Sequence, residues 1–290
     1  IETDEIAIPD MDSIEFIQAL IDRPIDETWD PDGTTRRSIL EYQRKIKGVE
    51  KTTISNMDET ETSSLIRYLD GVADSGNNLH LAFSNGADRL SYNKYNGSSW
   101  VGQSDVDDPD PNLIQNVAIA VDSSDYPGIA YLEDNKAYQR ALKYAKWDGS
   151  SWNTETLQAM GSVALRGIDI IFVSDKPWIL WFDTSSNLKV EKWDGSSWST
   201  DSVASSCGST SARMKKNSSG DIYIIYKSSG GNIKQAKWPS GGSSWTISTT
   251  GEDIGSYLDF DFDSDDEMDI VGMASNVVKY IHWYYITATV

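Results

Sequence analysis

One segment recurs along this chain, and it restricts the fold more than any other feature of the sequence. "KYAKWDGSSWNTETL" at 143–157 returns as "KVEKWDGSSWSTDSV" at 189–203, and looser copies begin at Ser91, Lys234 and Lys279. The apolar residues that open the copies are spaced by 52, 46, 45 and 45 residues: Leu90, Leu142, Leu188, Ile233 and Val278. A fixed period of about 20 to 50 residues is typical of repeat architectures, so the sequence predicts a five-fold array.

Each copy contains four short segments with the pattern of β-strands. Between residues 117 and 157, the apolar runs "VAIAV" and "GIAYL" precede "ALKYAKW", which alternates, and the polar, Thr-rich "NTETL". The intervening "DSSDYP", "EDNKAYQR" and "DGSSW" are rich in turn-forming residues. The pattern predicts an antiparallel meander of four strands, and the other copies divide in the same way.

A four-stranded unit of about 46 residues cannot bury both of its faces alone, so the copies must pack against one another. Units made only of strands stack in a line or close into a ring, and this length is typical of a propeller blade. We therefore predict an all-β fold, a five-bladed β-propeller of four-stranded antiparallel blades, within residues 49–290. Either 49–55 or 284–290 supplies the outer strand of the last blade. The predicted blades are 63–106, 115–157, 162–203, 209–250 and 255–290.

The hairpin after each third strand has the chemistry of a tight turn. An Asp-Gly pair supplies a positive φ at little cost, and the flanking aromatic residues are expected to pack across the hairpin or onto the next blade. In the two best-preserved copies, the structural turn residues are Trp147, Asp148, Gly149 and Trp152, and Trp193, Asp194, Gly195 and Trp198.

The segment "AVDSSDYPGIAY" followed by "LKYAKWDGSSW" resembles the WDGSSW-type propeller repeats of secreted and surface proteins of bacteria, archaea and their viruses. In that family the inner strand ends in an Asp-Ser turn, the next strand carries a Tyr, and a "YA-x-WDG-x-W" hairpin closes the blade. "WDGSSWS" is also similar to the hairpin of sugar-binding propeller lectins. The resemblance spans 63–290 and implies the propeller fold, while the hairpin itself is a structural device. The first and last copies depart from the pattern at Tyr95-Asn96 and Trp283-Tyr284.

The sequence lacks the usual signatures of catalysis, and we predict that the protein is not an enzyme. It has no GxSxG, HExxH or P-loop motif, and its two histidines, His80 and His282, have no partner at metal-ligand spacing. A sialidase would need three arginines that converge on a carboxylate. The Asp-containing turn motif of a sialidase also separates Asp from Gly by one residue. In this chain Asp148 and Gly149 are adjacent, as are Asp194 and Gly195. The three arginines near the starts of inner strands are Arg67, Arg166 and Arg213.

The segment "LDFDFDSDDEMD" holds the densest negative charge of the chain. Strand alternation places Asp259, Asp261 and Asp263 on one face, opposite Lys215 and Lys216 of the preceding blade. An EF-hand loop needs Gly at its sixth position and Glu at its twelfth, and this segment lacks both. We therefore predict no cofactor, with calcium as the alternative. The candidate calcium ligands are Asp261, Asp263 and Asp265.

Composition limits the partners. The chain has 45 acidic and 25 basic residues and a net charge of −20, so nucleic-acid phosphate is not an expected partner. No apolar run reaches the roughly 18 residues that cross a bilayer, so we predict no transmembrane segment. The single cysteine, Cys207, excludes an internal disulfide framework.

Ligand contacts are expected in the loops between second and third strands and between blades. These loops vary in sequence while the hairpins are uniform, and varied loops on a rigid frame commonly carry binding residues. Recognition of a glycan would require exposed aromatic rings beside Asp, Asn or Arg. For the tryptophans, burial between blades is the alternative. The candidates are Tyr138, Arg140, Trp178, Trp181 and Asp183.

Residues 1–48 differ from the repeats and are predicted to form an N-terminal anchor or assembly arm. "DSIEFIQALID" and "RRSILEYQRKIKG" have the pattern of two short helices. Apolar residues in the second helix follow the 3-4-3 spacing of a coiled-coil seam, so 36–49 offers a surface for homo-oligomerisation. Packing of this stripe on the flank of the propeller is the alternative.

Two functions fit these features. The first is a non-enzymatic recognition head, a virion spike or cell-envelope adhesin that binds a glycan or protein receptor outside the cell or on the virion surface. The arm would attach it to a larger particle or envelope protein. The second is a purely structural virion or envelope component whose propeller contacts neighbouring proteins.

Deletion of residues 1–48 tests the arm. Because its apolar stripes favour association, the full chain is expected to self-associate or to attach to a larger partner, whereas the truncated chain stays monomeric with unchanged β content. Light scattering of both proteins distinguishes the two states. A monomeric full chain whose truncated form melts much earlier would show that the arm belongs to the propeller core.

Overall fold

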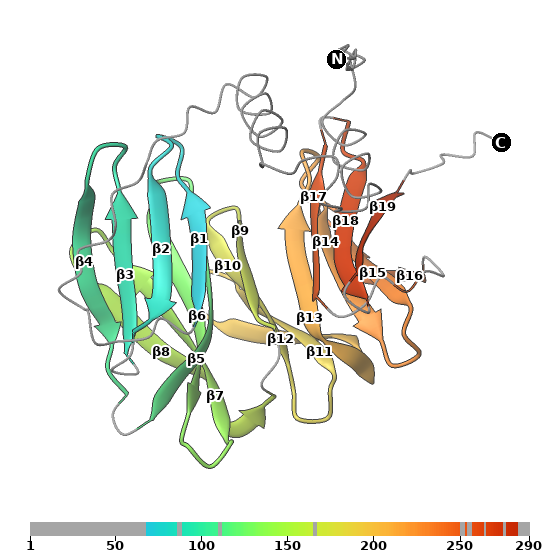
Figure 1. The fold of residues 1–290 in the computed structure, drawn as a ribbon, viewed down its shortest axis with the longest axis horizontal. Coiled ribbons are helices and arrows are strands. Elements are labelled where there is room, and N and C mark those ends of the chain that lie inside the picture. Colours follow the sequence, from blue (N-terminus) through green and yellow to red (C-terminus); the bar gives the residue numbers. More distant parts are fainter. Residues whose placement is uncertain are drawn as a thin grey trace, which may run out of the picture. The chain divides into compact units, whose positions relative to one another are not determined.

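The computed structural model confirms the predicted fold class, a five-bladed β-propeller (Figure 1). It describes residues 68–85, 89–109, 112–164, 167–249, 253, 257–263, 265–274 and 277–283, all within one compact unit, Asn56–Val290. The predicted arm, 1–48, and both candidate closing segments, 49–55 and 284–290, lie outside the described residues. Within the described part of the chain, no helix has the length and hydropathy required to cross a membrane.

Each sheet is one blade, and its strands follow one another in chain order (Figure 1). Blade 1 contains β1 (Leu69–Ala73), β2 (Leu79–Ser84), β3 (Leu90–Tyr95) and β4 (Trp100–Asp107). Blade 2 contains β5 (Leu113–Val121), β6 (Pro127–Asp134), β7 (Arg140–Trp147) and β8 (Trp152–Val163). Blade 3 contains β9 (Asp169–Val173), β10 (Lys176–Phe182), β11 (Leu188–Trp193) and β12 (Trp198–Ala204).

The last two blades follow the same plan. Blade 4 contains β13 (Cys207–Lys216), β14 (Ile222–Ser228), β15 (Ile233–Trp238) and β16 (Thr246–Thr249). Blade 5 contains β17 (Tyr257–Phe262), β18 (Met268–Ala274) and β19 (Val277–Trp283). Three strands of blade 5 therefore fall within the described residues, and all strand pairs of the five sheets are antiparallel.

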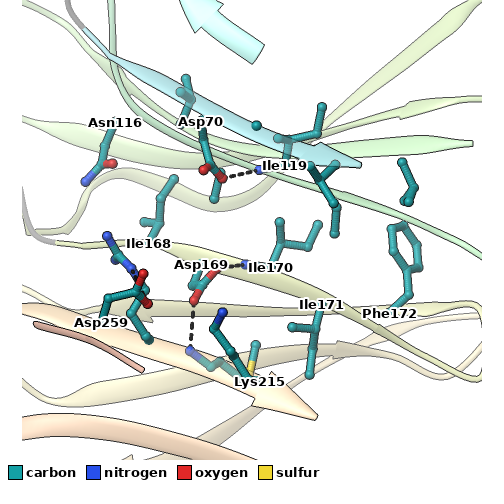
Figure 2. A pocket seen from close by; sticks show the side chains of 18 of the residues that line it. Asp70, Asn116, Ile119, Ile168, Asp169, Ile170, Ile171, Phe172, Lys215 and Asp259 are labelled. Atoms are coloured by element: carbon teal, nitrogen blue, oxygen red, sulfur yellow. Dashed lines mark hydrogen bonds and ion pairs between the residues drawn. The ribbon is translucent and has the colours of Figure 1, made fainter. Parts of the chain in front are cut away.

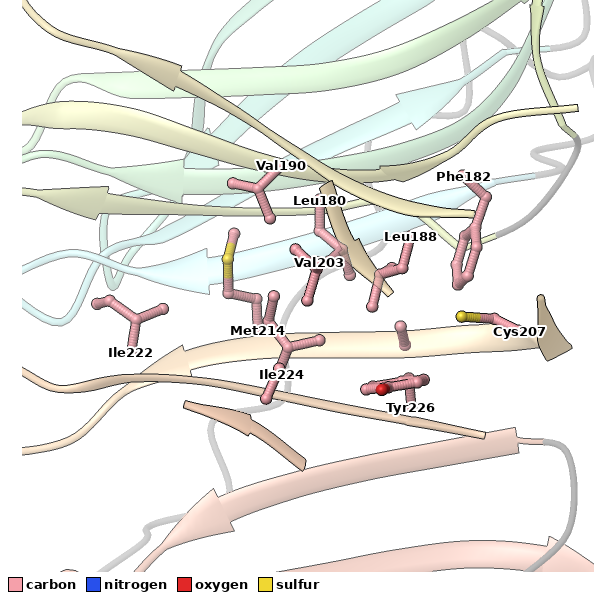
Figure 3. Close-up of a cluster of buried hydrophobic side chains, with 12 residues drawn as sticks. Leu180, Phe182, Leu188, Val190, Val203, Cys207, Met214, Ile222, Ile224 and Tyr226 are labelled. Atoms are coloured by element: carbon pink, nitrogen blue, oxygen red, sulfur yellow. The ribbon is translucent and has the colours of Figure 1, made fainter. Parts of the chain in front are cut away.

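Strand alternation gives the blades apolar faces, and these faces are buried together at the four junctions between consecutive blades. In β6, Ile129 and Tyr131 pack with blade 1, whereas Ala130 and Leu132 pack with blade 3. Figure 3 shows the same arrangement one junction further, where Leu180 and Val190 of blade 3 face residues of blade 4. The blade 4 residues are Met214, Ile222, Ile224 and Tyr226. The hydrophobic core of this protein is therefore a series of layers between blades.

The WDGSSW hairpin closes through the aspartate rather than through its apolar residues. Asp148 Oδ1 accepts hydrogen bonds from the backbone N–H groups of Ser150 and Ser151, both at 2.8 Å. These bonds hold the pKa of Asp148 well below its usual range. Gly149 has a φ of 100°, a conformation that side chains with a Cβ rarely adopt. Asp194 repeats the arrangement in blade 3.

The tryptophans that flank each hairpin pack against one another. Ring centroids are 5.5 Å apart for Trp147 and Trp152 and 5.4 Å apart for Trp193 and Trp198. The second ring of each pair also reaches the preceding blade. Trp198 contacts Tyr144 at 5.5 Å and donates a hydrogen bond from Nε1 to Glu155. The hairpin therefore contributes to the packing between blades.

A polar contact also connects the turns after successive inner strands. The backbone N–H of Ser75 donates to Asp125 Oδ1 of blade 2 at 2.9 Å. Ser123 donates in the same way to Asp175 of blade 3, at 2.9 Å. The turn aspartate adopts a positive φ at both junctions, 62° and 60°. Each contact links one blade to the next.

Substitution of the hairpin glycine tests the interdependence of the blades. Gly195 has a φ of 108°, and Val strongly resists this conformation, so Gly195→Val should lower the free energy of unfolding by about 1–3 kcal/mol. The loss should appear as one shifted cooperative transition, because both neighbours of blade 3 pack on it. Urea denaturation followed by fluorescence measures it.

Gly230→Ala provides the matched control. An added Cβ at this position meets only Ser228 Oγ, at 3.9 Å, so stability should be unchanged or slightly higher. A loss below about 0.5 kcal/mol for Gly195→Val would contradict the structural role of the turn.

Candidate ligand-binding face

The loop between β6 and β7 presents the most exposed aromatic ring among the described residues. The ring belongs to Tyr138, which is 81% exposed. The loop is closed by a backbone hydrogen bond from Asn135 N to Gln139 O, at 3.1 Å. The side-chain amide of Asn135 donates to Gln139 Oε1 at 2.8 Å, and Asn135 Oδ1 accepts from the backbone of Ala137. The ring is therefore exposed on a loop that is internally hydrogen-bonded.

The same closing bond occurs in the corresponding loops of blades 3 and 4, from Asp183 to Asn187 and from Ser228 to Asn232. In all three loops the residue before the acceptor has a positive φ. Blade 4 places a glycine there, blade 3 a serine and blade 2 a tyrosine: Gly231 (95°), Ser186 (64°) and Tyr138 (61°). A bulky residue in this region costs free energy. Tyr138 thus combines an unfavourable backbone conformation with an exposed ring, and neither contributes to the core.

Arg140 and Asp134 form an ion pair next to the loop that carries this ring. The Arg140 side chain is 10% exposed and the Asp134 side chain 1%, and Arg140 Nε lies 3.0 Å from Asp134 Oδ2. The N–H is not directed at the oxygen, so neither atom makes a hydrogen bond within the described residues. Arg140 also donates from a terminal nitrogen to Tyr138 O at 3.2 Å and lies 6.0 Å from the centre of its ring. The pair therefore fixes the loop that carries Tyr138.

Strand pairing places Asp183 at the junction of blades 2 and 3, at the end where Arg140 lies. Arg140 pairs with Val163 at the end of β8, and Val163 forms an isolated bridge with Asp183. Ala164 N also donates to Phe182 O, at 2.9 Å. Three predicted site residues, Tyr138, Arg140 and Asp183, are therefore gathered at one junction.

The Asp183 carboxylate accepts hydrogen bonds from its own loop. Its Oδ1 accepts hydrogen bonds from the backbone of Ser185 and Asn187, both at 2.9 Å, and its Oδ2 accepts from the side chain of Asn187. These bonds shape the blade 3 loop beside Tyr138.

The two predicted tryptophans lie inside the packing between blades. Trp181 is 4% exposed and donates from Nε1 to Glu191 at 3.1 Å. Trp178 packs against Trp238 of blade 4, with centroids 5.5 Å apart, and Lys192 lies 5.1 Å from its centre. Trp181 belongs to the buried layer between blades 2 and 3 and Trp178 to that between blades 3 and 4, so neither ring is exposed beside Tyr138. Asp134 was not among the predicted residues, because its pairing with Arg140 across the β6–β7 ladder depends on strand register.

The inner strands β1, β5, β9, β13 and β17 surround a central cavity of about 510 Å³ (Figure 2). Its polar lining includes Asp70, Asp169, Arg213 and Asp259. Asp70 Oδ2 accepts from the backbone of Ile119 in β5, and Asp169 Oδ2 accepts from Met214 in β13. These two carboxylates therefore bind neighbouring inner strands together.

Burial controls the ionisation of these carboxylates. Burial raises the pKa of Asp169 to about 6, although Arg213 and two backbone hydrogen bonds oppose the shift. The pKa of Asp70 is also raised by burial. Arg213 Nε lies 3.8 Å from Asp259 Oδ1. The predicted convergence with Arg67 and Arg166 involves two residues outside the described part of the chain.

The acidic segment of β17 follows the predicted alternation. Phe260 is buried, Asp259 and Asp261 are on the exposed side, and Lys215 pairs with Asp261 at 3.3 Å as expected. The candidate calcium ligands are not brought together. Among the described residues, Asp263 forms a compact ligand group with Glu267 and His282, whereas Asp261 and Asp265 belong to none. The turn before β18 therefore brings two carboxylates to His282, which spacing along the sequence did not indicate.

No protein-family model matches the chain, and no curated protein matches it in sequence. Solved propellers do resemble it. A mutant of the Aleuria aurantia lectin in complex with α-methyl-L-fucoside is 16% identical, with a TM-score of 0.55 over 77% of this chain and 75% of that one. Another structure of that lectin, with a TM-score of 0.53 and 16% identity over 77% and 76% of the chains, is described as a six-bladed propeller. The polysaccharide lyase Uly1 is 10% identical, with a TM-score of 0.55 over 79% of this chain and 60% of the lyase. At these identities the likeness shows the propeller fold.

The raised pKa of Asp169 makes the stability of the folded protein depend on pH. Because its pKa is about 6 in the folded protein and lower in the unfolded chain, the folded state holds an additional proton between roughly pH 4 and 6. The stabilisation from this proton is complete below roughly pH 4 and is lost as the pH rises through about 6.

Asp169→Asn retains an oxygen acceptor for Met214 but cannot ionise. Its free energy of unfolding relative to the wild type should therefore rise by about 1–3 kcal/mol between roughly pH 4 and 7. Urea titrations of both proteins across this range measure the difference. A difference that does not vary with pH would contradict the assignment.

Proposed function

We propose that this protein is a non-enzymatic glycan-binding propeller whose binding site lies at the junction of blades 2 and 3. The observation that carries the proposal is Tyr138, an exposed ring at a position where blade 4 uses glycine. A position of this kind gains nothing for folding from an aromatic residue. Contact with a ligand accounts for both the exposure and the unfavourable backbone.

The surrounding groups suit a sugar. A pyranose has an apolar face that stacks on an aromatic ring and hydroxyl groups that require donors and acceptors at its edge. Arg140 and Asp134 form an ion pair, and Arg140 also donates to Tyr138 O, so this pair holds the loop that presents the ring. Asn135 and Gln139 add side-chain amides in the same loop.

The structural neighbours support the ligand class. Several of them are lectins described with fucose or a fucoside, including the SapL1 lectin in complex with α-methyl fucoside. The presence of a polysaccharide lyase among the neighbours is also consistent with recognition of carbohydrate polymers by this fold. Binding without cleavage is favoured because the cavity carboxylates Asp70 and Asp169 already accept backbone hydrogen bonds.

The proposal includes display on a virion or cell envelope, with residues 1–48 as the attachment arm. This part rests on the sequence of the arm and on the resemblance of the repeat to surface proteins. A purely structural component of a particle is the competing function. It would show no affinity for glycans and would bury the Tyr138 loop against a neighbouring protein.

Substitution of Tyr138 separates binding from folding. Tyr138→Gly restores the residue that blade 4 uses at this position, so the protein should be at least as stable as the wild type, while glycan affinity falls by 10-fold or more as the stacking platform is lost. A glycan array identifies the ligand, and calorimetry with α-methyl-L-fucoside as the first probe measures affinity.

Tyr126→Ala is the matched control. Tyr126 is 41% exposed and precedes β6, at the end of that strand opposite the Tyr138 loop, so affinity should not change. Equal loss in both variants, or wild-type affinity in Tyr138→Gly, would place binding elsewhere. Absence of any glycan ligand for the wild type would favour the structural component.

A further inference from the structure

Blade 5 departs from the charge pattern that the other blades share. In blades 1 and 2 a lysine near the end of the third strand pairs with the aspartate that opens the turn after the inner strand. Lys94 lies 2.8 Å from Asp74, and Lys146 lies 2.6 Å from Asp122. Each of these lysines directly precedes the aromatic residue at the end of its strand.

Blade 4 preserves the lysine but moves its partner. The turn opens with an uncharged residue, Asn217, and the carboxylate appears at the fifth position instead, where Asp221 lies 2.6 Å from Lys237. In blade 3 the corresponding turn is shorter, and Lys192 pairs with Asp201 of β12 at 2.6 Å. All four lysines therefore meet a carboxylate.

In blade 5 the lysine position is occupied by His282, and the carboxylates increase in number. The turn carries an acid at both places, Asp263 at its first position and Glu267 at its fifth. Asp269 lies directly across the ladder from His282. Among the described residues, these three carboxylates have no lysine or arginine partner. The lysine of the other blades, whose protonated amine does not bind metal, is thus replaced by His282, whose imidazole does. Three carboxylates surround this imidazole.

The geometry points to a site for a divalent transition-metal ion, of the Zn²⁺ class, held by Asp263, Glu267 and His282. One oxygen of each carboxylate and one ring nitrogen of His282 all lie within 4.8 Å of one another. His282 Nε2 is 2.9 Å from Glu267 Oε2. An imidazole with two carboxylates and a free fourth position is a ligand set that Zn²⁺ accepts, whereas Ca²⁺ prefers oxygen ligands alone.

The second nitrogen of His282 has the environment that metal-bound histidines require. Nδ1 lies 2.6 Å from Asp269 Oδ1, and this oxygen also accepts a hydrogen bond from the Tyr280 hydroxyl at 2.6 Å. A carboxylate at this place fixes the tautomer and directs Nε2 toward the metal. Asp269 is therefore a positioning residue rather than a ligand.

The remaining ligands are arranged for entry of an ion. Asp263 Oδ1 accepts from the backbone of Asp265 and Glu267, both at 2.9 Å, which holds the carboxylate and leaves its other oxygen for a metal. The Glu267 side chain is 33% exposed and that of His282 20%, so solvent reaches the group. Rotation of the Glu267 side chain can shorten the distances to those of a coordinated ion.

Zinc titration of the full chain tests the site. We expect one equivalent of Zn²⁺ to bind the wild type by calorimetry, and Co²⁺ to give the visible absorption of a low-symmetry N/O site. His282→Lys restores the residue of blades 1 to 4, so the variant should fold normally and bind Zn²⁺ at least 10-fold more weakly. Asp269→Asn should weaken binding by roughly 10- to 100-fold.

Asp265→Asn is the matched control, because Asp265 is an exposed acid of the same turn outside the ligand group. It should retain wild-type affinity. The inference would be overturned by no zinc binding in the wild type, by equal affinity in folded His282→Lys, or by Ca²⁺ competing equally for the site. His80, which is 1% exposed in blade 1, offers no competing surface imidazole.

Discussion

Burial of apolar sheet faces between consecutive blades is the constraint on which the rest of this structure depends. A single four-stranded sheet leaves one or both faces in water, and the free energy of hydrophobic burial becomes available only when blades stack. The layers between blades are correspondingly large. Tyr131, Leu142 and Leu180 are all fully buried, and each belongs to a layer shared by two sheets. No blade is therefore an independent folding unit.

Polar contacts at the edges of these layers fix how one blade sits on the next. The turn aspartates Asp125, Asp175 and Asp266 each accept from a serine of the preceding blade. Trp198 and Trp245 donate to carboxylates of the outer strand of the preceding blade. Many acidic residues of this chain thus act as acceptors for N–H groups, which explains part of its negative charge in structural terms.

Repetition makes departures from the pattern informative. Equivalent positions in different blades have similar backbone geometry, so a residue that differs from its counterparts points to a role beyond the shared fold. Tyr138 differs from Gly231 at a position of positive φ, and His282 differs from Lys146 at a position of charge pairing. The two departures lie in different blades. They correspond to the proposed glycan site and the proposed metal site.

The sequence by itself determined the architecture. The period, the strand pattern and the Asp-Gly turns are local features, and any ring of such units must bury the same faces. The opposition of Lys215 and Asp261 also followed from strand alternation in adjacent blades. Residues 1–48 were assigned to an arm on sequence alone.

Only the tertiary structure decided which side chains meet at the junctions. Arg140 and Asp183 both pair with Val163 at the end of β8, an arrangement that depends on strand register and on a bulge in the β7–β8 ladder. Trp181 and Tyr138 are both aromatic residues of blade ends, yet one is buried and the other exposed. Periodicity gives equivalent positions, whereas contacts across a turn or between blades depend on the three-dimensional closure of each loop. That closure placed Asp263 and Glu267 beside His282, although 19 and 15 residues separate them in the sequence.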